Sequence, residues 1–232
     1  MPSKKILIIP ARLGSKRIKK KNFFKLEGKM LIDHVVENAL KTKIFNKIII
    51  TTDNKNYLKK NNFKTNKKII FDYRNSNLSS GNATIIEVIK YTINKFKFFE
   101  DNICCTFPTS IFLEKKHYKK AFEKLKKKEK LIIVPIKKYE HPINRAIKVL
   151  NNFKAKILIN KNANKRTQDS NRYFYDAGQF YLANARVWLK NTKILNNNFC
   201  PLKLNILDSQ FLIDVDEIED LSLLKFLHKI KS

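Results

Sequence analysis

The stretch KILIIPARLGSKRIKKKN, residues 5–22, decides the fold class. Residues 5–9 form a largely apolar run of strand length, which is typical of a strand buried on both faces of a sheet. The run opens directly into a loop, residues 10–22, that holds a glycine, a serine and several cations. Backbone N–H groups and cations in such a loop can surround a triphosphate, although the loop matches neither G-x-x-x-x-G-K-S/T nor G-x-G-x-x-G. The alternative interpretation is a basic surface loop in a basic protein.

Short apolar runs continue to alternate with longer amphipathic stretches along the chain. Further strands are predicted at residues 47–52, 68–71, 102–107, 131–135, 179–182 and 203–206. Helices are predicted at residues 29–42, 82–96 and 115–128, and a last helix carries one apolar stripe of Ile218, Leu221, Leu224 and Leu227. This alternation indicates an α/β fold with a mostly parallel sheet between helices, and ligands of such sheets bind at the carboxyl ends of the strands.

The alternation breaks between Lys137 and Arg172. Two strands are predicted there, at residues 145–150 and 153–159, with little helical periodicity around them. An excursion of this kind often serves as a lid or a subunit contact. Because no Gly/Ser/Pro-rich linker divides the sequence, we expect residues 1–232 to form a single domain with residues 137–172 as a small inserted arm.

The net charge of +29 first suggests a nucleic-acid partner. Lysine supplies 42 of the 49 basic residues, and glycine and proline are scarce, which is the skew that an A/T-rich coding sequence produces. The charge is also spread from end to end and is not gathered into one stripe. We therefore favour a solvated basic surface without a nucleic-acid partner, and a basic, non-catalytic nucleic-acid-binding protein is the alternative.

Cysteine usage and hydropathy bear on the compartment. Cys104, Cys105 and Cys200 have neither C-x-x-C spacing nor a histidine at metal-ligand distance, and an odd count suits a reducing compartment. The apolar stretch at residues 6–9 is too short for a secretory signal, and no run approaches the ~18 apolar residues of a membrane span. A cytoplasmic protein with no membrane partner is predicted.

A second candidate site is Asp214-Val215-Asp216, which precedes the last helix. Residues i and i+2 of an extended segment point the same way, so both carboxylates can face one ion. Mg²⁺ accepts one or two carboxylates and completes its shell with phosphate oxygens and water. The alternative is that Asp216 caps the helix. Together with the cationic loop, the carboxylate pair suggests metal-assisted chemistry on a nucleoside triphosphate.

Short motifs occur in a characteristic order over nearly the whole chain. They are PARLGSKRI at residues 10–18 with Lys21-Asn22, GKMLI at 28–32, TTD at 51–53, PTS at 108–110 and IDVD at 213–216. In this order they resemble the motifs of the CMP-nonulosonate synthetases, the family that contains the CMP-sialic acid synthetases. Within that family, PINRA at 142–146, RTQD at 166–169 and YDAGQFY at 175–181 are similar to the pseudaminic acid cytidylyltransferase branch. Leu13, Lys19 and Gly81 depart from the pattern by replacing a glycine, a proline and an acidic residue, and Leu13 bears most on the phosphate loop.

The resemblance implies a Rossmann-like, three-layer nucleotidyltransferase fold. It implies the transfer of CMP from CTP to the anomeric hydroxyl of pseudaminic acid, with release of pyrophosphate and with Mg²⁺ as the metal. The same reaction on N-acetylneuraminate, legionaminate or another keto-acid sugar stays open. The resemblance further implies a homodimer, in which residues 137–172 form a dimerisation arm that reaches the neighbouring active site.

The resemblance also assigns roles to individual residues. The implied nucleotide-binding residues are Arg12, Ser15, Lys16, Lys21, Asn22 and Thr84, and the implied metal ligands are Asp214 and Asp216. The implied sugar-binding residues are Arg145, Arg166, Gln168, Asp176, Gln179 and Tyr181. Arg145 or Arg166 would meet the sugar carboxylate, where a planar guanidinium suits a bidentate pair. Arg12, Lys21 and Asp216 would be catalytic, and core packing is the alternative role of Tyr181.

Overall fold

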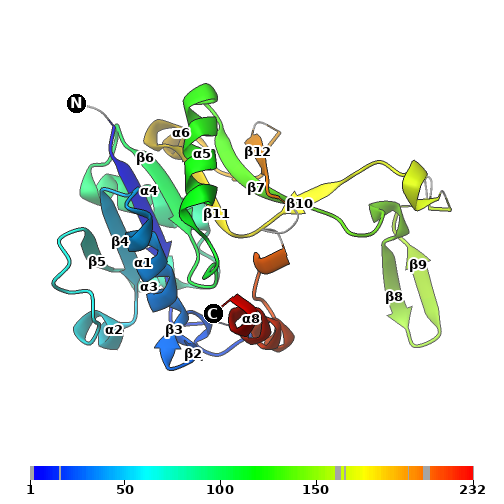
Figure 1. Cartoon of the computed structure of the whole chain (residues 1–232), viewed down its shortest axis with the longest axis horizontal. Coiled ribbons are helices and arrows are strands. Elements are labelled where there is room, and N and C mark those ends of the chain that lie inside the picture. Colours follow the sequence, from blue (N-terminus) through cyan, green and yellow to red (C-terminus); the bar gives the residue numbers. More distant parts are fainter. Residues whose placement is uncertain are drawn as a thin grey trace. The chain divides into compact units, whose positions relative to one another are not determined.

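The computed structural model describes residues 3–15, 17–159, 163–164, 166–197, 199–205 and 210–231. The chain forms two compact units (Figure 1), Met1–Pro135 together with Ala177–Ser232, and Ile136–Asp176. None of the helices in the described part of the chain combines the length and the apolar character that crossing a membrane requires.

One mixed sheet runs through the first unit. Its strands follow the order β7 (Ile132–Lys138), β11 (Phe180–Asn184), β6 (Asn102–Thr106), β1 (Lys5–Pro10), β4 (Lys47–Thr52) and β5 (Ile69–Tyr73), and β12 (Phe199–Lys203) pairs with β7. β1 runs parallel to β4 and β6, and β4 runs parallel to β5, while β11 is antiparallel to both β6 and β7. The prediction of a mostly parallel sheet is confirmed.

Helices cover both faces of the sheet. α1 (Leu31–Thr42) packs beside α5 (Lys115–Lys127), and α4 (Ile85–Phe96) packs beside α6 (Ala185–Lys190). Figure 1 shows these two pairs on opposite faces of the sheet, and this gives the three layers that were predicted. Further helices that lie wholly within the described residues are the short α2 (Lys55–Lys59) and α3 (Ser76–Ser79) and the longer α8 (Ile218–Lys231).

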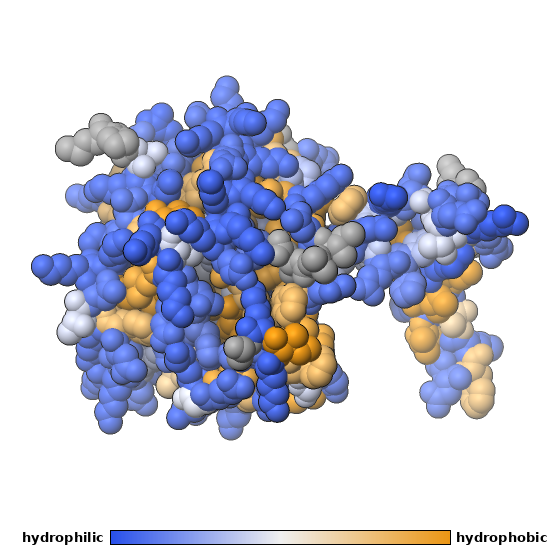
Figure 2. Space-filling model, in the orientation of Figure 1, coloured by the Kyte–Doolittle hydropathy of each residue, from blue (hydrophilic) through white to orange (hydrophobic). Residues whose placement is uncertain are grey.

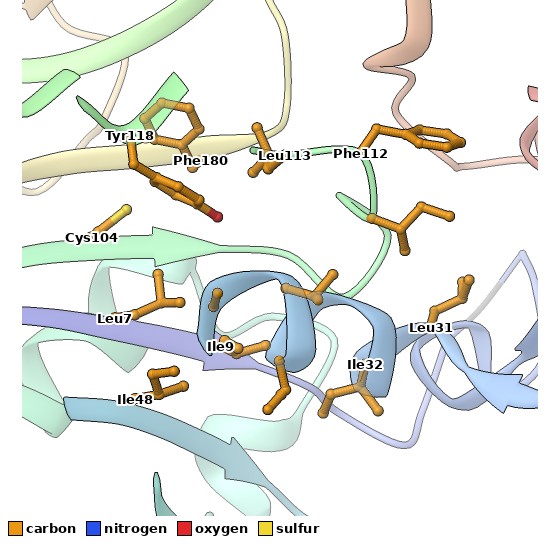
Figure 3. Close-up of a cluster of buried hydrophobic side chains, with 14 of the residues drawn as sticks. Leu7, Ile9, Leu31, Ile32, Ile48, Cys104, Phe112, Leu113, Tyr118 and Phe180 are labelled. Atoms are coloured by element: carbon orange, nitrogen blue, oxygen red, sulfur yellow. The ribbon is translucent and has the colours of Figure 1, made fainter. Parts of the chain in front are cut away.

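The core explains why the first strand is apolar on both faces. All four side chains at residues 6–9 are fully buried. Leu7 and Ile9 belong to a cluster with Leu31 and Ile32 of α1 and Tyr118 of α5 (Figure 3). Burying one such aliphatic side chain stabilises a fold by about 1.5–3 kcal/mol, so this strand fixes the centre of the sheet and with it the start of the basic loop.

Some short elements were not predicted. The loop after β1 contains a 3-10 turn at Lys21–Phe23, and a small hairpin of β2 (Lys25–Leu26) and β3 (Lys29–Met30) follows. The turn between these strands has positive φ at Glu27 (48°) and Gly28 (80°), as a two-residue hairpin turn requires. Strands of two residues carry no periodicity that a sequence could display.

The strand predicted at 203–206 was misplaced. The structure places β12 at Phe199–Lys203, and residue 206 lies outside the described residues. Pro201 lies within this strand. Proline is tolerated in strands that lack a second hydrogen-bonded neighbour, and among the described strands β12 pairs with β7 alone.

The second unit contains an exposed hairpin. β8 (Ile147–Asn151) pairs antiparallel with β9 (Lys154–Ile157), close to the strands predicted there, and β10 (Phe174–Asp176) pairs with the end of β7. The hairpin displays apolar side chains to solvent (Figure 2), with Val149 71% and Phe153 95% exposed. A cluster of apolar side chains at such exposure is typical of interaction surfaces.

Candidate active site

The loop after β1 and the acidic segment before α8 line one cavity of about 440 Å³ in the first unit. The cavity lies at the carboxyl ends of parallel strands, because its wall includes Pro10 of β1, Arg74 after β5 and Phe107 after β6. The loop contributes Arg12, Ser15, Arg17, Lys21 and Asn22, and the acidic segment contributes Asp214 and Asp216. The two candidate sites that the sequence suggested are therefore parts of one cavity. Lys16, expected to bind phosphate, lies outside the described residues.

Ion pairs join the basic loop to the acidic segment. The Lys21 ammonium donates to the carbonyl oxygen of Val215 and lies 3.2 Å from Oδ1 of Asp216. Nη2 of Arg17 lies 2.7 Å from the same Asp216 oxygen, and its Nη1 lies 3.3 Å from Oε1 of Glu217. The Asp216 side chain is 41% exposed, so solvent weakens these pairs and they can be exchanged for a charged ligand.

The contacts of Asp216 bear on the alternative that it caps the last helix. The carboxylate of Asp220, in the first turn of α8, accepts the N–H groups of Asp216 and Glu217 at 2.7 Å each. Asp220 thus satisfies backbone donors at the start of this helix. The Asp216 carboxylate is directed to the basic loop, as the ion pairs above show.

Hydrogen bonds hold the basic loop in place. The backbone N–H of Leu13 donates to Oδ1 of Asp53 at 2.6 Å, so this amide already has a partner within the protein. The side-chain amide of Asn22 donates to the carbonyl oxygen of Arg12 at 2.9 Å. Nη1 of Arg12 in turn donates to the carbonyl oxygen of Ser80 at 3.2 Å. Asp53, at the end of β4, is thus an anchor of the loop, and Asn22 supports the loop from within.

The second carboxylate, Asp214, lies against the backbone of Gly178. Gly178 has a φ of 60°, in the left-handed region, and lines the same cavity as Asp214. A Cβ atom added at residue 178 would lie 2.6 Å from Oδ2 of Asp214. Glycine at this position therefore leaves the space that the carboxylate occupies.

The donor set of the cavity fits a hard divalent cation. Mg²⁺ takes one or two carboxylates and completes its shell with phosphate oxygens and water. Oδ1 of Asp216 already has two cationic partners, so the cavity accommodates positive charge at this point. No group of three or more His, Cys, Asp and Glu in the described chain is arranged to hold a metal by itself. The residues therefore fit Mg²⁺ in company with a bound phosphate.

Arg74 lines the cavity and was missed by the sequence reasoning. Arg74 is only 3% exposed, and its Nε atom is buried without a hydrogen-bond partner. Burial lowers the pKa of its guanidinium, and the nearby Asp53 opposes this shift. A buried cation with an unpaired donor is costly unless a ligand satisfies it. One signal could have found it, since arginine is rare in this chain and Arg74 lies three residues after the strand predicted at 68–71.

Three expected site residues have different surroundings. Thr84 is the N-cap of α4 and forms a capping box with Glu87: its hydroxyl accepts the Glu87 N–H at 3.3 Å, and its own N–H donates to Oε2 of Glu87 at 2.6 Å. Gln179 is 1% exposed, and its side-chain amide donates to the backbone. Tyr181 does line the cavity, although it is only 7% exposed, and its ring packs edge-on against Phe107 with centroids 5.9 Å apart. Tyr181 thus combines packing with a place in the cavity wall.

The other four expected sugar-binding residues belong to the second unit. Arg145 donates from Nε to the carbonyl oxygen of Ala163 at 3.4 Å and from Nη1 to Oγ1 of Thr167 at 3.2 Å. Arg166 and Gln168 are exposed, and Gln168 lines a separate cavity of about 420 Å³ within this unit. Asp176 ends β10.

The family of the chain follows from a comparison with known proteins. Residues 6–230 match the model of the cytidylyltransferase family. The chain belongs to this family. Membership confirms the enzyme interpretation and sets aside the non-catalytic, nucleic-acid-binding alternative.

Relatives of this cytidylyltransferase include enzymes for several keto-acid sugars. A pseudaminic acid cytidylyltransferase of Campylobacter jejuni is 30% identical over 234 residues, which cover 98% of this chain and 97% of the relative. An N-acylneuraminate cytidylyltransferase of Escherichia coli is 27% identical, and the match covers 96% of this chain and 52% of the relative. A solved structure of a CMP:2-keto-3-deoxy-manno-octonic acid synthetase complexed with CTP matches with a TM-score of 0.69 at 15% identity, over 99% of this chain and 100% of the other. The last likeness confirms the nucleotidyltransferase fold.

The anchoring role of Asp53 is testable. Asp53→Ala removes the acceptor of the Leu13 amide, and a hydrogen bond to a charged group contributes about 1.5–3 kcal/mol, so we expect amide exchange in the loop to accelerate about tenfold or more. Hydrogen–deuterium exchange with mass spectrometry of residues 11–22 measures this. Asp101→Ala is the matched control, because Asp101 accepts the Lys4 amide at 2.8 Å before the other end of β1. Unchanged exchange in the loop of the Asp53 variant contradicts the anchoring role.

Proposed function

We propose that this cytidylyltransferase transfers CMP from CTP to the anomeric hydroxyl of pseudaminic acid and releases pyrophosphate. The observation that carries the proposal is the single cavity that holds both the basic loop and the carboxylates Asp214 and Asp216. The Campylobacter jejuni relative, matched over 97% of its length, favours pseudaminic acid as the sugar. N-acetylneuraminate, legionaminate or another keto-acid sugar is the alternative, and the Escherichia coli relative keeps it in view.

The basic residues of the cavity would bind the triphosphate. Phosphoryl transfer depends mainly on positioning and on stabilising charge, so cations around the phosphates are the expected machinery. Arg12, Arg17 and Lys21 line the cavity with charge, and Ser15 adds a hydroxyl. Lys16 is proposed as a further phosphate contact. Binding would transfer part of the pairing of Arg17 and Lys21 from Asp216 to the phosphates.

The nucleoside would lie against the wall formed by β5 and the start of α4. Arg74 supplies a buried guanidinium there with a donor left over for a polar ligand atom. Ala83 and Ile85, on either side of the cap residue Thr84, provide apolar wall. Thr84 would therefore support the nucleoside site through the start of α4. Asn22 would act similarly by holding the carbonyl oxygen of Arg12.

Asp214 and Asp216 would hold Mg²⁺. When bound, the ion would polarise the α-phosphate and neutralise charge on the leaving pyrophosphate. The protein keeps both carboxylates in one cavity beside the cationic side chains. Lys21 contributes to this by binding both the Val215 carbonyl oxygen and the Asp216 carboxylate.

The sugar would contact Tyr181 in the cavity. We propose that residues of the second unit of a partner copy also bind the sugar. Arg145 or Arg166 would bind its carboxylate, since a guanidinium forms bidentate pairs with carboxylates. Gln168 and Asp176 are proposed as further sugar contacts.

We further propose a cytoplasmic homodimer. The exposed apolar hairpin β8–β9 is the proposed contact with a second copy of the chain, because a surface of this kind is stabilised when it is covered. The described cysteines, Cys104, Cys105 and Cys200, are buried free thiols, which suits the reducing compartment in which CTP is made.

Release of pyrophosphate tests the reaction. With CTP, Mg²⁺ and a panel of nonulosonates, we expect turnover that is highest with pseudaminic acid. Asp216→Asn should lower turnover by about 100-fold or more, because it removes charge at the reacting phosphate, and should leave the melting temperature nearly unchanged. Glu219→Gln, an exposed change in the first turn of α8, is the control and should retain turnover. Folded enzyme that binds CTP but turns over no sugar contradicts the proposal.

Mixed variants test whether the second unit serves the site of a partner. Arg166→Ala changes the second unit and Asp216→Ala the first. If each site combines the first unit of one copy with the second unit of the other, a hybrid dimer has one site with both residues intact and one site with neither. Random mixing should then restore about a quarter of wild-type turnover. A mixture of Arg166→Ala with Arg145→Ala is the control and should restore none. Absence of rescue, with hybrid dimers verified by native mass spectrometry, contradicts sharing.

A further inference from the structure

Two neighbouring residues, Gly178 and Gln179, contact the segment that carries Asp214. They lie just before β11, in the motif whose resemblance pointed to the sugar site. Gly178 lies against the Asp214 side chain itself. Gln179 is hydrogen-bonded to Ile213, the residue before Asp214. These contacts indicate that the two residues influence the position of the Asp214 carboxylate.

Gly178 defines the space for the carboxylate. A Cβ atom at this position would lie 2.6 Å from Oδ2, 2.9 Å from Cγ and 3.4 Å from Cβ of Asp214. The first two distances are too short for non-bonded atoms, so any larger residue would displace the Asp214 side chain. The φ of 60° adds a second requirement for glycine at this position.

Gln179 fixes the backbone that leads to the carboxylate. Its Nε2 atom donates to the carbonyl oxygen of Ile213 at 2.9 Å and to that of Ala177 at 3.0 Å. The residue is buried, with 1% of its surface exposed. The side-chain amide has two N–H groups, so it can donate to both acceptors at once. It thereby links the segment before β11 to the acidic segment.

The backbone of Gln179 is itself held by the sheet. Its carbonyl oxygen accepts the hydroxyl groups of Thr106 and Ser110, each at 3.0 Å, and both hydroxyls are buried. Thr106 ends β6 and Ser110 belongs to the turn that follows. A continuous set of hydrogen bonds therefore runs from the central sheet through Gln179 to Ile213, one residue before Asp214.

The acidic segment needs such support because residues 212–216 have no regular secondary structure. Asp216 is located from the other side, by Lys21 and Arg17 of the basic loop. The two carboxylates are thus positioned by separate anchors, one from the sheet and one from the loop. Mg²⁺ demands near-ideal octahedral geometry, so a small displacement of one carboxylate weakens its binding.

We propose that Gly178 and Gln179 are positioning residues that set the Asp214 carboxylate for metal binding. The inference rests on the proposed metal-dependent function and gives Gln179 a role other than sugar contact. Groups that orient metal ligands typically change metal affinity by about 10–100-fold when they are removed. The effect should appear in metal binding itself, before any sugar is present.

Gly178→Ala and Gly28→Ala form a matched pair for the first test. Both glycines have positive φ, 60° and 80°, so alanine introduces similar backbone strain, but a Cβ at Gly28 meets nothing within 4 Å. Binding of Mn²⁺ in the presence of CTP is measured by electron paramagnetic resonance. We expect Gly178→Ala alone to raise the Mn²⁺ Kd by about 10-fold or more, with CTP binding in the absence of metal unchanged. Equal Mn²⁺ affinity in the two variants overturns the role of Gly178.

Gln179→Met removes both amide donors at similar volume and keeps the test open if Gly178→Ala does not fold. Thr92→Val is its control, since Thr92 is fully buried and its hydroxyl donates to the Val88 carbonyl oxygen at 2.8 Å, in α4. Gln179→Met should raise the Mn²⁺ Kd by about 10-fold, and the concentration of Mg²⁺ needed for half-maximal pyrophosphate release should rise with it. Turnover should recover at saturating Mg²⁺.

The outcomes separate the two proposals. Wild-type enzyme that binds Mn²⁺ and turns over, with Gln179→Met equal to it in Mn²⁺ affinity, overturns the positioning role and leaves the proposed function intact. A raised KM for the sugar at unchanged Mn²⁺ affinity does the same and returns Gln179 to the sugar site. Wild-type enzyme that neither binds Mn²⁺ with CTP nor releases pyrophosphate overturns both proposals.

Discussion

The contact of Lys21 with Val215 and Asp216 is the constraint on which the site depends. It joins Lys21 to residues that are 194 and 195 positions away in the sequence and brings a basic loop against an acidic segment. Each group of like charges repels itself, so the two are stable in one cavity because they are paired. The pairs remain partly hydrated, since the Asp216 side chain is 41% exposed. Charges held in this way are positioned in advance and can still be exchanged for a ligand.

The central sheet supplies the fixed points around this pairing. β1 starts the basic loop, Asp53 after β4 anchors it, and Arg74 after β5 adds a buried cation. On the opposite side, Gln179 connects the sheet to Ile213. The carboxyl ends of the parallel strands meet at one edge of the sheet and bring the basic loop, Asp53 and Arg74 together. Gln179 reaches the same edge because it precedes β11, which runs antiparallel to β6. A cavity for a charged nucleotide thus arises from strand order, and the loops supply its chemistry.

The sequence predicted those features that depend on local pattern. The buried strand at residues 6–9 and the helix at Leu31–Thr42 follow from runs and spacings of apolar residues, and the structure confirms both. Arg74 could not be placed in this way, because its importance comes from burial beside other strands. The resemblance of a motif identified Gln179 but not the direction of its side chain, which only the packing of distant segments determines. The strand predicted at 203–206 was misplaced, and the observed β12 contains Pro201, a residue that is atypical of strand interiors.

A crystal structure of the enzyme with CTP and Mn²⁺ tests the central claim most directly, with the metal located by its anomalous signal. We expect one metal peak at bonding distance from carboxylate oxygens of Asp214 and Asp216. Triphosphate oxygens should lie between this metal and the side chains of Arg12 and Lys21. A metal or a triphosphate bound outside this cavity would contradict the account, however active the enzyme proved to be.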